Sequence, residues 1–311
     1  MFSLNATLPV FLVMVIGWAL GQKGFLPKQF CTVADKLVFK VTLPVMLFCD
    51  MATLDLAHSF DAKFVLFCFA VTAIAIVVIW VLARRLLKDK TLVGEFVQAS
   101  YRSSAAILGV AFIQNIYGTS GMAPLMIIGT VPLYNIAAVL ILSFTGSESE
   151  GLRPAALKKS VKGILTNPII IGIAAGMIAS LFQVHFPAII SKTVNNIAVL
   201  ATPLALIGLG AGFEGKKALA EIKPTLVCSF MKLMLWPALF LPLAALLGFR
   251  DEKMVALLVM LGSPTTVSCY IMAKNMKHPG ILTSSVVVAT TFLSSVTLTF
   301  WLYLLKSLSL I

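Results

Sequence analysis

The stretch MVALLVMLGSPTTVSCYIMA (254–273) has no charged residue, and its length suits a helix that crosses a bilayer. Its centre holds Gly262 and Pro264, and a proline inside a helix removes an N–H donor and costs about 3 kcal/mol. Backbone groups freed at membrane depth are tolerated where protein or a water-filled cavity satisfies them. Hydroxyl groups flank the proline at Ser263, Thr265, Thr266 and Ser268. These residues predict a broken helix that lines a substrate cavity, with a simple proline kink as the alternative.

A second candidate stretch, EFVQASYRSSAAILG (95–109), places Arg102 well inside an apolar segment. An arginine near the middle of a bilayer costs between about 3 and 17 kcal/mol, and such residues usually serve a function. The guanidinium presents a fork of donors that fits a carboxylate. We therefore predict that Arg102, Ser103 and Ser104 bind substrate together with the hydroxyls of 263–268 and Pro264. Snorkelling of Arg102 to the interface is the alternative.

Other polar residues in the apolar segments have more modest interpretations. Asp50 and Glu95 are the best protonatable candidates for coupling to H⁺ or Na⁺, although each lies near a segment end where water can solvate it. Lys232 could be a second anion contact, but the favoured interpretation is that its apolar stem reaches the cytoplasmic interface. Asn135 could donate or accept a hydrogen bond within the bundle or at the site, and packing is the favoured interpretation.

The composition identifies a membrane protein. Of 311 residues, 59% are apolar and 12% are charged, about half the charged share of a soluble domain. The fold class that we predict is an all-α polytopic membrane protein with ten transmembrane helices. Their expected ranges are 5–22, 31–52, 64–83, 93–116, 122–144, 163–183, 189–212, 224–247, 254–273 and 281–305.

Basic residues set the orientation of these segments. Of the 24 Lys and Arg residues, 15 fall in loops on one side of the predicted membrane and 5 on the other. The positive-inside rule makes the richer side cytoplasmic, which places both termini outside. Asp35, Lys36 and Lys40 are expected to form a cytoplasmic charge cluster. The net charge of +12 is thus explained by topology in a plasma (cytoplasmic) membrane, without nucleic-acid binding.

The two halves of the chain share a register. Pro9 and Pro168 are separated by 159 residues, and so are Pro44 and Pro203. The offset also aligns 63–87 with 222–246 and Gly17 with Gly176. Residues 1–145 and 163–311 are therefore predicted to be two five-helix inverted repeats, joined by a cytoplasmic linker over 146–162. Inverted repeats with discontinuous helices at the midplane are typical of secondary transporters.

These features resemble the auxin efflux carrier family, which includes the plant PIN carriers and bacterial carriers labelled malonate or malate permeases. The most specific stretches are SPTTVSCYIMAKNMKHPGILTSSVVVATTFLS (263–294) and FVQASYRSSAAILGVAF (96–112), although the latter has Ser-Ser-Ala where the family commonly has Asn, often with Pro. The resemblance implies an elevator-like carrier in which helices four and nine cross at the substrate site. It also implies a scaffold of helices one, two, six and seven, often dimeric, and an organic anion as substrate.

The function predicted from the sequence is secondary transport of a small organic anion, a mono- or dicarboxylate, across the lipid bilayer. No Walker A loop supports a pump, and no zinc or nucleophile–base motif supports an enzyme, a cofactor or a metal site. An anion channel or a non-transporting membrane sensor is the alternative.

Overall fold

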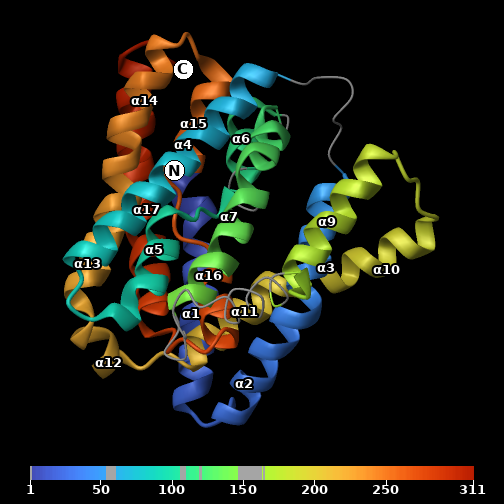
Figure 1. The fold of residues 1–311 in the computed structure, drawn as a ribbon, viewed down its shortest axis with the longest axis vertical. Coiled ribbons are helices and arrows are strands. Elements are labelled where there is room, and N and C mark those ends of the chain that lie inside the picture. Colours follow the sequence, from blue (N-terminus) through green and yellow to red (C-terminus); the bar gives the residue numbers. More distant parts are fainter. Residues whose placement is uncertain (1, 54–60, 106–109, 119–120, 146–162, 164) are drawn as a thin grey trace.

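The computed structural model describes residues 2–53, 61–105, 110–118, 121–145, 163 and 165–311. Within these ranges the chain forms helices and no strand (Figure 1). The elements before residue 146 are α1 (Phe2–Gln22), α2 (Lys28–Leu37), η1 (Val38–Thr42), α3 (Leu43–Ala52), α4 (Ala62–Leu86), η2 (Lys90–Leu92), α5 (Val93–Tyr101), α6 (Val110–Tyr117) and α7 (Ala123–Thr145). Those after it are α9 (Pro168–Leu181), α10 (Ala188–Ala198), α11 (Ala201–Ala211), α12 (Gly215–Ala220), α13 (Ile222–Phe230), η4 (Met231–Leu235), α14 (Trp236–Leu246), α15 (Asp251–Gly262), α16 (Ser268–Asn275) and α17 (Ile281–Ser307).

Helix length and composition agree with a polytopic membrane protein. Five helical stretches of the described chain are long and apolar enough to cross a bilayer. They are Ala62–Leu86, Ala123–Thr145, Ala188–Ala211, Ile222–Leu246 and Ile281–Ser307. Large apolar side chains, among them Leu66, Phe230 and Leu246, remain exposed on the outside of these helices, as a lipid-facing surface requires. The arrangement of ten spans in two inverted repeats stays a prediction, and the linker predicted over 146–162 lies outside the described residues.

Two spans continue through a widened π-helical turn: η1 joins α2 to α3, and η4 joins α13 to α14. The segment expected over 189–212 is present as the stretch Ala188–Ala211, in which a turn at Val199 and Leu200 separates α10 from α11. The cause is Pro203 in the first turn of α11, since it has no N–H to donate to the Val199 carbonyl four residues back.

Glycines bring two pairs of helices into backbone contact. A Cβ at Gly17 or Gly21 of α1 would overlap the backbone of α11 at Ile207 or Ala211. A Cβ at Gly172 or Gly176 of α9 would likewise overlap the backbone of α3, at Pro44 or Phe48. Small residues of this kind allow close helix packing in membranes.

Gly208 and Gly212 of α11 are also four residues apart but do not act in this way. They face the side chains of Asp35 and Tyr270, whereas Gly210 between them is the residue that packs on α1, at Met14. Gly208 thereby leaves room for the buried carboxylate of Asp35.

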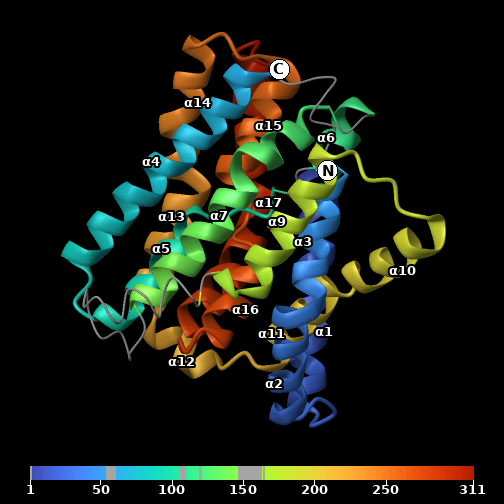
Figure 2. The same cartoon turned by 45° about the vertical axis from the view of Figure 1, so that its right-hand side comes forward.

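Both interrupted helices lie inside the bundle. α15 ends at Gly262 and α16 begins at Ser268, as Pro264 predicted. The fourth span is interrupted as well, because α5 ends at Tyr101 and Arg102 has extended backbone angles (φ −72°, ψ 132°). In both views α10 projects away from the other helices (Figures 1 and 2).

Candidate functional site

The two helix breaks meet and hold each other open through hydrogen bonds. The Ser104 N–H donates to the Pro264 carbonyl at 3.1 Å, and the Thr265 hydroxyl donates to the Ala99 carbonyl at 2.7 Å. The Ser103 hydroxyl donates to the Met260 carbonyl. Each break therefore supplies donors for the carbonyls that the other leaves without a helical partner.

One helix supplies the remaining caps from Lys232 and Trp236, which are four residues apart and so share a helix face. The Trp236 Nε1–H donates to the carbonyl of Ser100 in α5 at 3.0 Å. The Lys232 Nζ donates to the carbonyl of Leu261 in α15 at 2.5 Å and to that of Met260 at 3.4 Å. Lys232 is fully buried, so its interpretation as a residue that reaches the interface was wrong.

Arg102 occupies the centre of this junction. It is 2% exposed, which excludes snorkelling in this structure. One terminal nitrogen, Nη2, donates to Asn135 Oδ1 at 2.8 Å and to Ser268 Oγ at 3.0 Å, while Nη1 contacts the Met272 sulfur. The Nε–H is buried and has no partner among the residues that the structure describes. No carboxylate in the described part of the chain forms an ion pair with Arg102.

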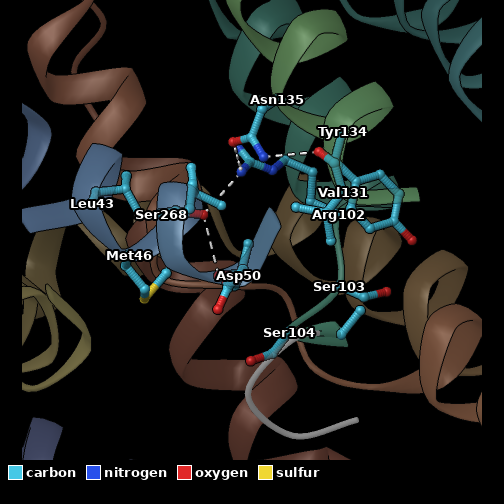
Figure 3. Close-up of a pocket in the computed structure, with 13 residues that line it drawn as sticks. Leu43, Met46, Asp50, Arg102, Ser103, Ser104, Val131, Tyr134, Asn135 and Ser268 are labelled. Carbon is cyan, nitrogen blue, oxygen red and sulfur yellow. Dashed lines mark hydrogen bonds between the residues drawn. The ribbon is translucent and has the colours of Figure 1, made fainter. Parts of the chain in front are cut away.

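The guanidinium lines a small cavity of about 40 Å³ (Figure 3). The polar groups of its wall come from Asp50, Arg102, Ser103, Ser104, Tyr134, Asn135, Thr266 and Ser268. Thr266 and Ser268 lie at the start of α16, where the helix dipole favours negative charge. The remainder of the wall is apolar, from Leu43, Met46, Leu47, Ala105 and Val131. A buried cation, hydroxyls and a helix N-terminus together form an environment suited to a small anion.

The structure brings five of the predicted binding residues to this cavity, namely Arg102, Ser103, Ser104, Thr266 and Ser268. It does not bring Ser263, Pro264 and Thr265 there. Thr265 is engaged on both sides, since its N–H donates to the Thr290 hydroxyl at 3.1 Å. The Ser263 hydroxyl is fully buried and has no partner among the described residues. These three residues shape the break behind the cavity wall.

The two candidate coupling carboxylates lie in different surroundings. Asp50 in α3 lines the cavity (Figure 3). Its Oδ2 is buried and accepts no hydrogen bond from the described part of the chain. Glu95 is fully buried elsewhere, at the start of α17. Its carboxylate accepts from the Gly280 N–H at 2.7 Å and the Thr283 N–H at 3.0 Å. Glu95 therefore caps α17 from a neighbouring helix.

Two further polar residues behave differently from their sequence interpretation. Asn135 was assigned to packing, but its side-chain oxygen accepts from Arg102 and its residue lines the cavity. Asp35 was assigned to a cytoplasmic cluster with Lys36 and Lys40, which are exposed. Asp35 is buried instead, and its Oδ2 accepts from the Tyr270 hydroxyl at 3.3 Å. For Asn135, the available sequence signal of a role at the site was an amide side chain in a strongly apolar helix. No sequence signal indicated the partner of Asp35.

Comparison with known proteins gives two matches that cover almost the whole chain. The sequence profile described as "Membrane transport protein" matches residues 2–302. A protein of Methanothermobacter thermautotrophicus, described as an "Uncharacterized transporter", is 20% identical over 305 residues, covering 97% of this chain and 98% of the relative.

Proposed function

Because the chain belongs to the membrane transport protein family, the family of the auxin efflux carriers, we propose that it is a secondary transporter of a small organic anion, a mono- or dicarboxylate. Membership confirms the resemblance predicted from the sequence and establishes the chain as a membrane transport protein. The substrate and the mechanism are the proposal. They rest on the residues around Arg102.

The observation that carries the proposal is a buried cation in the cavity wall that forms no ion pair with any described residue. Arg102 is buried, its hydrogen-bond partners within the described chain are neutral, and its Nε–H has none there. Asp50 lines the same cavity but forms no ion pair with Arg102. A buried cation without an ion-pair partner is unfavourable, so a bound anion would stabilise the site more than a neutral ligand. A carboxylate matches the fork of the guanidinium and the hydroxyls of Ser103 and Ser268.

The mechanism that we propose is an elevator-like movement between two inverted repeats. Support comes from paired contacts that the repeat relates: α1 packs on α11 as α9 packs on α3, in each case through glycines. The two breaks also pair across the same junction. In this proposal, spans one, two, six and seven form the scaffold, and the helices that carry Arg102 and Ser268 move.

The cavity wall combines residues of the proposed scaffold with residues of the proposed moving unit. Asp50 belongs to α3, in the proposed scaffold, whereas Arg102 and Ser268 belong to the proposed moving unit. Its buried, unpaired oxygen makes Asp50 the better of the two candidates for H⁺ coupling, because the Glu95 carboxylate is already occupied by α17.

We further propose that the protein resides in the plasma membrane, with both termini outside, as a homodimer through its scaffold. Helix α10 supports the dimer. Its polar side chains Ser191, Lys192, Asn195 and Asn196 are all exposed in the single chain, although α10 belongs to a stretch apolar enough to cross the bilayer. Amides and hydroxyls facing lipid are costly, so a second copy would cover them favourably.

Counterflow in proteoliposomes tests the function. Purified protein is reconstituted with an unlabelled carboxylate trapped inside, and uptake of the labelled compound is measured for malonate, malate and propionate in turn. A carrier accelerates uptake when unlabelled substrate is trapped, whereas a channel or a sensor does not.

The Arg102→Ala variant identifies the site in the same assay. Uptake should fall to the level of empty liposomes, because the variant removes the positive charge that stabilises the anion. The matched control is Arg84→Ala, since Arg84 is exposed at the end of α4. Folding of both variants is checked by size-exclusion chromatography. Near-normal uptake by folded Arg102→Ala would refute the site.

A further inference from the structure

Lys232 is the most unusual charged residue outside the cavity wall. It lies in the π-helical turn η4 and is fully buried. Its hydrogen-bond acceptors are two backbone carbonyls, those of Met260 and Leu261, and no carboxylate of the described chain forms an ion pair with it. A buried ammonium held by main-chain oxygens alone is a cation site in which the cation is a side chain.

The carbonyls involved are the last ones of a helix that stops inside the protein. α15 ends at Gly262, so the carbonyls of Met260 and Leu261 have lost their helical partners. The end of a helix carries negative potential. In transporters with broken helices, such carbonyls coordinate Na⁺. The Lys232 ammonium has the same charge and meets the same kind of ligand.

The surrounding structure fixes the ammonium in this position. A π-helical turn leaves a backbone carbonyl without its usual partner, and here the Leu233 carbonyl accepts from the Trp301 Nε1–H at 3.0 Å. On the next turn, the Trp236 Nε1–H anchors the same helix to the Ser100 carbonyl. Two indole hydrogen bonds, at Leu233 and Trp236, therefore fix the helix directly after Lys232, whose ammonium lies at the end of α15.

We infer that Lys232 is a tethered cation that takes the place of an alkali ion at the break in the ninth span. The break in α15 therefore needs no Na⁺ or K⁺ to form, in contrast to broken helices whose carbonyls bind a free ion. Removal of the ammonium should leave a vacant cation site made of the carbonyls of Met260 and Leu261. This inference concerns the fold of the break and does not depend on which anion is carried.

The test is the thermal stability of the purified full-length protein in detergent, measured in choline chloride, NaCl, KCl and methylammonium chloride at equal ionic strength. For Lys232→Ala we expect a fall in Tm of at least about 5 °C in choline, since the buried Leu261 carbonyl loses its donor and the Met260 carbonyl keeps the Ser103 hydroxyl but loses the ammonium. Methylammonium, which restores the ammonium, should recover most of the loss in a saturable manner. Choline is too large to enter.

Two comparisons make the result decisive. Trp236→Phe removes a neutral donor one turn away, and its loss of stability should be the same in all four salts. The wild-type protein should show equal Tm values in choline and in NaCl, which can be measured even if Lys232→Ala does not fold. A Lys232→Ala variant that methylammonium fails to stabilise, or a wild-type protein that Na⁺ stabilises saturably, would overturn the inference. The assay contains no carboxylate substrate. A negative result would therefore contradict the role of Lys232 without bearing on the proposed anion transport.

Discussion

The break after Tyr101 and the break after Gly262 occupy matching places in the fold, yet different chemistry keeps each one open. At the first, neutral donors satisfy the freed carbonyls: Trp236 caps Ser100 and Thr265 caps Ala99. At the second, Lys232 caps Met260 and Leu261 with a charge. The positive charge of Arg102, which belongs to the first break, is directed into the cavity instead. At the first break, the cation Arg102 faces the cavity where a ligand could bind. At the second, the cation Lys232 caps the backbone carbonyls of the break itself.

The breaks also differ in what interrupts the helix. Pro264 ends α15 by local chemistry, since it can neither donate to the Met260 carbonyl nor allow the preceding residue a helical backbone. The fourth span has no proline near Arg102, and its extended backbone is held by tertiary hydrogen bonds, such as that from Ser104 to the Pro264 carbonyl. The first break therefore depends on the second.

Of the variants considered, Pro264→Ala should have the largest effect on the dependence of the first break on the second. The variant restores an N–H four residues after Met260, which would compete with Ser103 and Lys232 for the same carbonyl and extend α15 into the junction. Uptake should fall about tenfold, equivalent to roughly 1.4 kcal/mol in activation free energy, while the Tm changes little. The matched control is Pro242→Ala, at an exposed position of α14. Unaltered uptake kinetics would show that the proline has no role in transport.

Asp50→Asn, in the α3 part of the cavity wall, should have a smaller effect. Loss of the titratable group should flatten the pH dependence of uptake and lower its rate about threefold, or roughly 0.6 kcal/mol. Glu95→Gln is the control, because Glu95 caps α17 away from the cavity. It should lower the Tm by a few degrees, about the cost of a weakened buried hydrogen bond, and preserve the pH profile. The opposite pattern would transfer the coupling role to Glu95.

The same contrast explains what the sequence could predict. Pro264 was a local signal that predicted the break in the ninth span. Arg102, an arginine inside an apolar segment, predicted the position of the binding site. The break at Arg102 and the cap from Lys232 could not be predicted in this way, because both depend on residues more than a hundred positions apart or on a neighbouring helix. Asn135 and Asp35 illustrate the same limit: a polar residue in an apolar helix is visible in the sequence, but its partner is set by packing.

The most direct test of the central claim, that Arg102 provides the anion site, is equilibrium binding of matched carboxylate and amide pairs. Isothermal titration of the purified protein with succinate and succinamide, and with propionate and propionamide, separates charge from shape. Wild-type protein should bind at least one carboxylate and neither amide, and Arg102→Gln should lose that binding while Arg84→Gln retains it. Equal binding of acid and amide, or undiminished carboxylate binding by folded Arg102→Gln, would contradict the account.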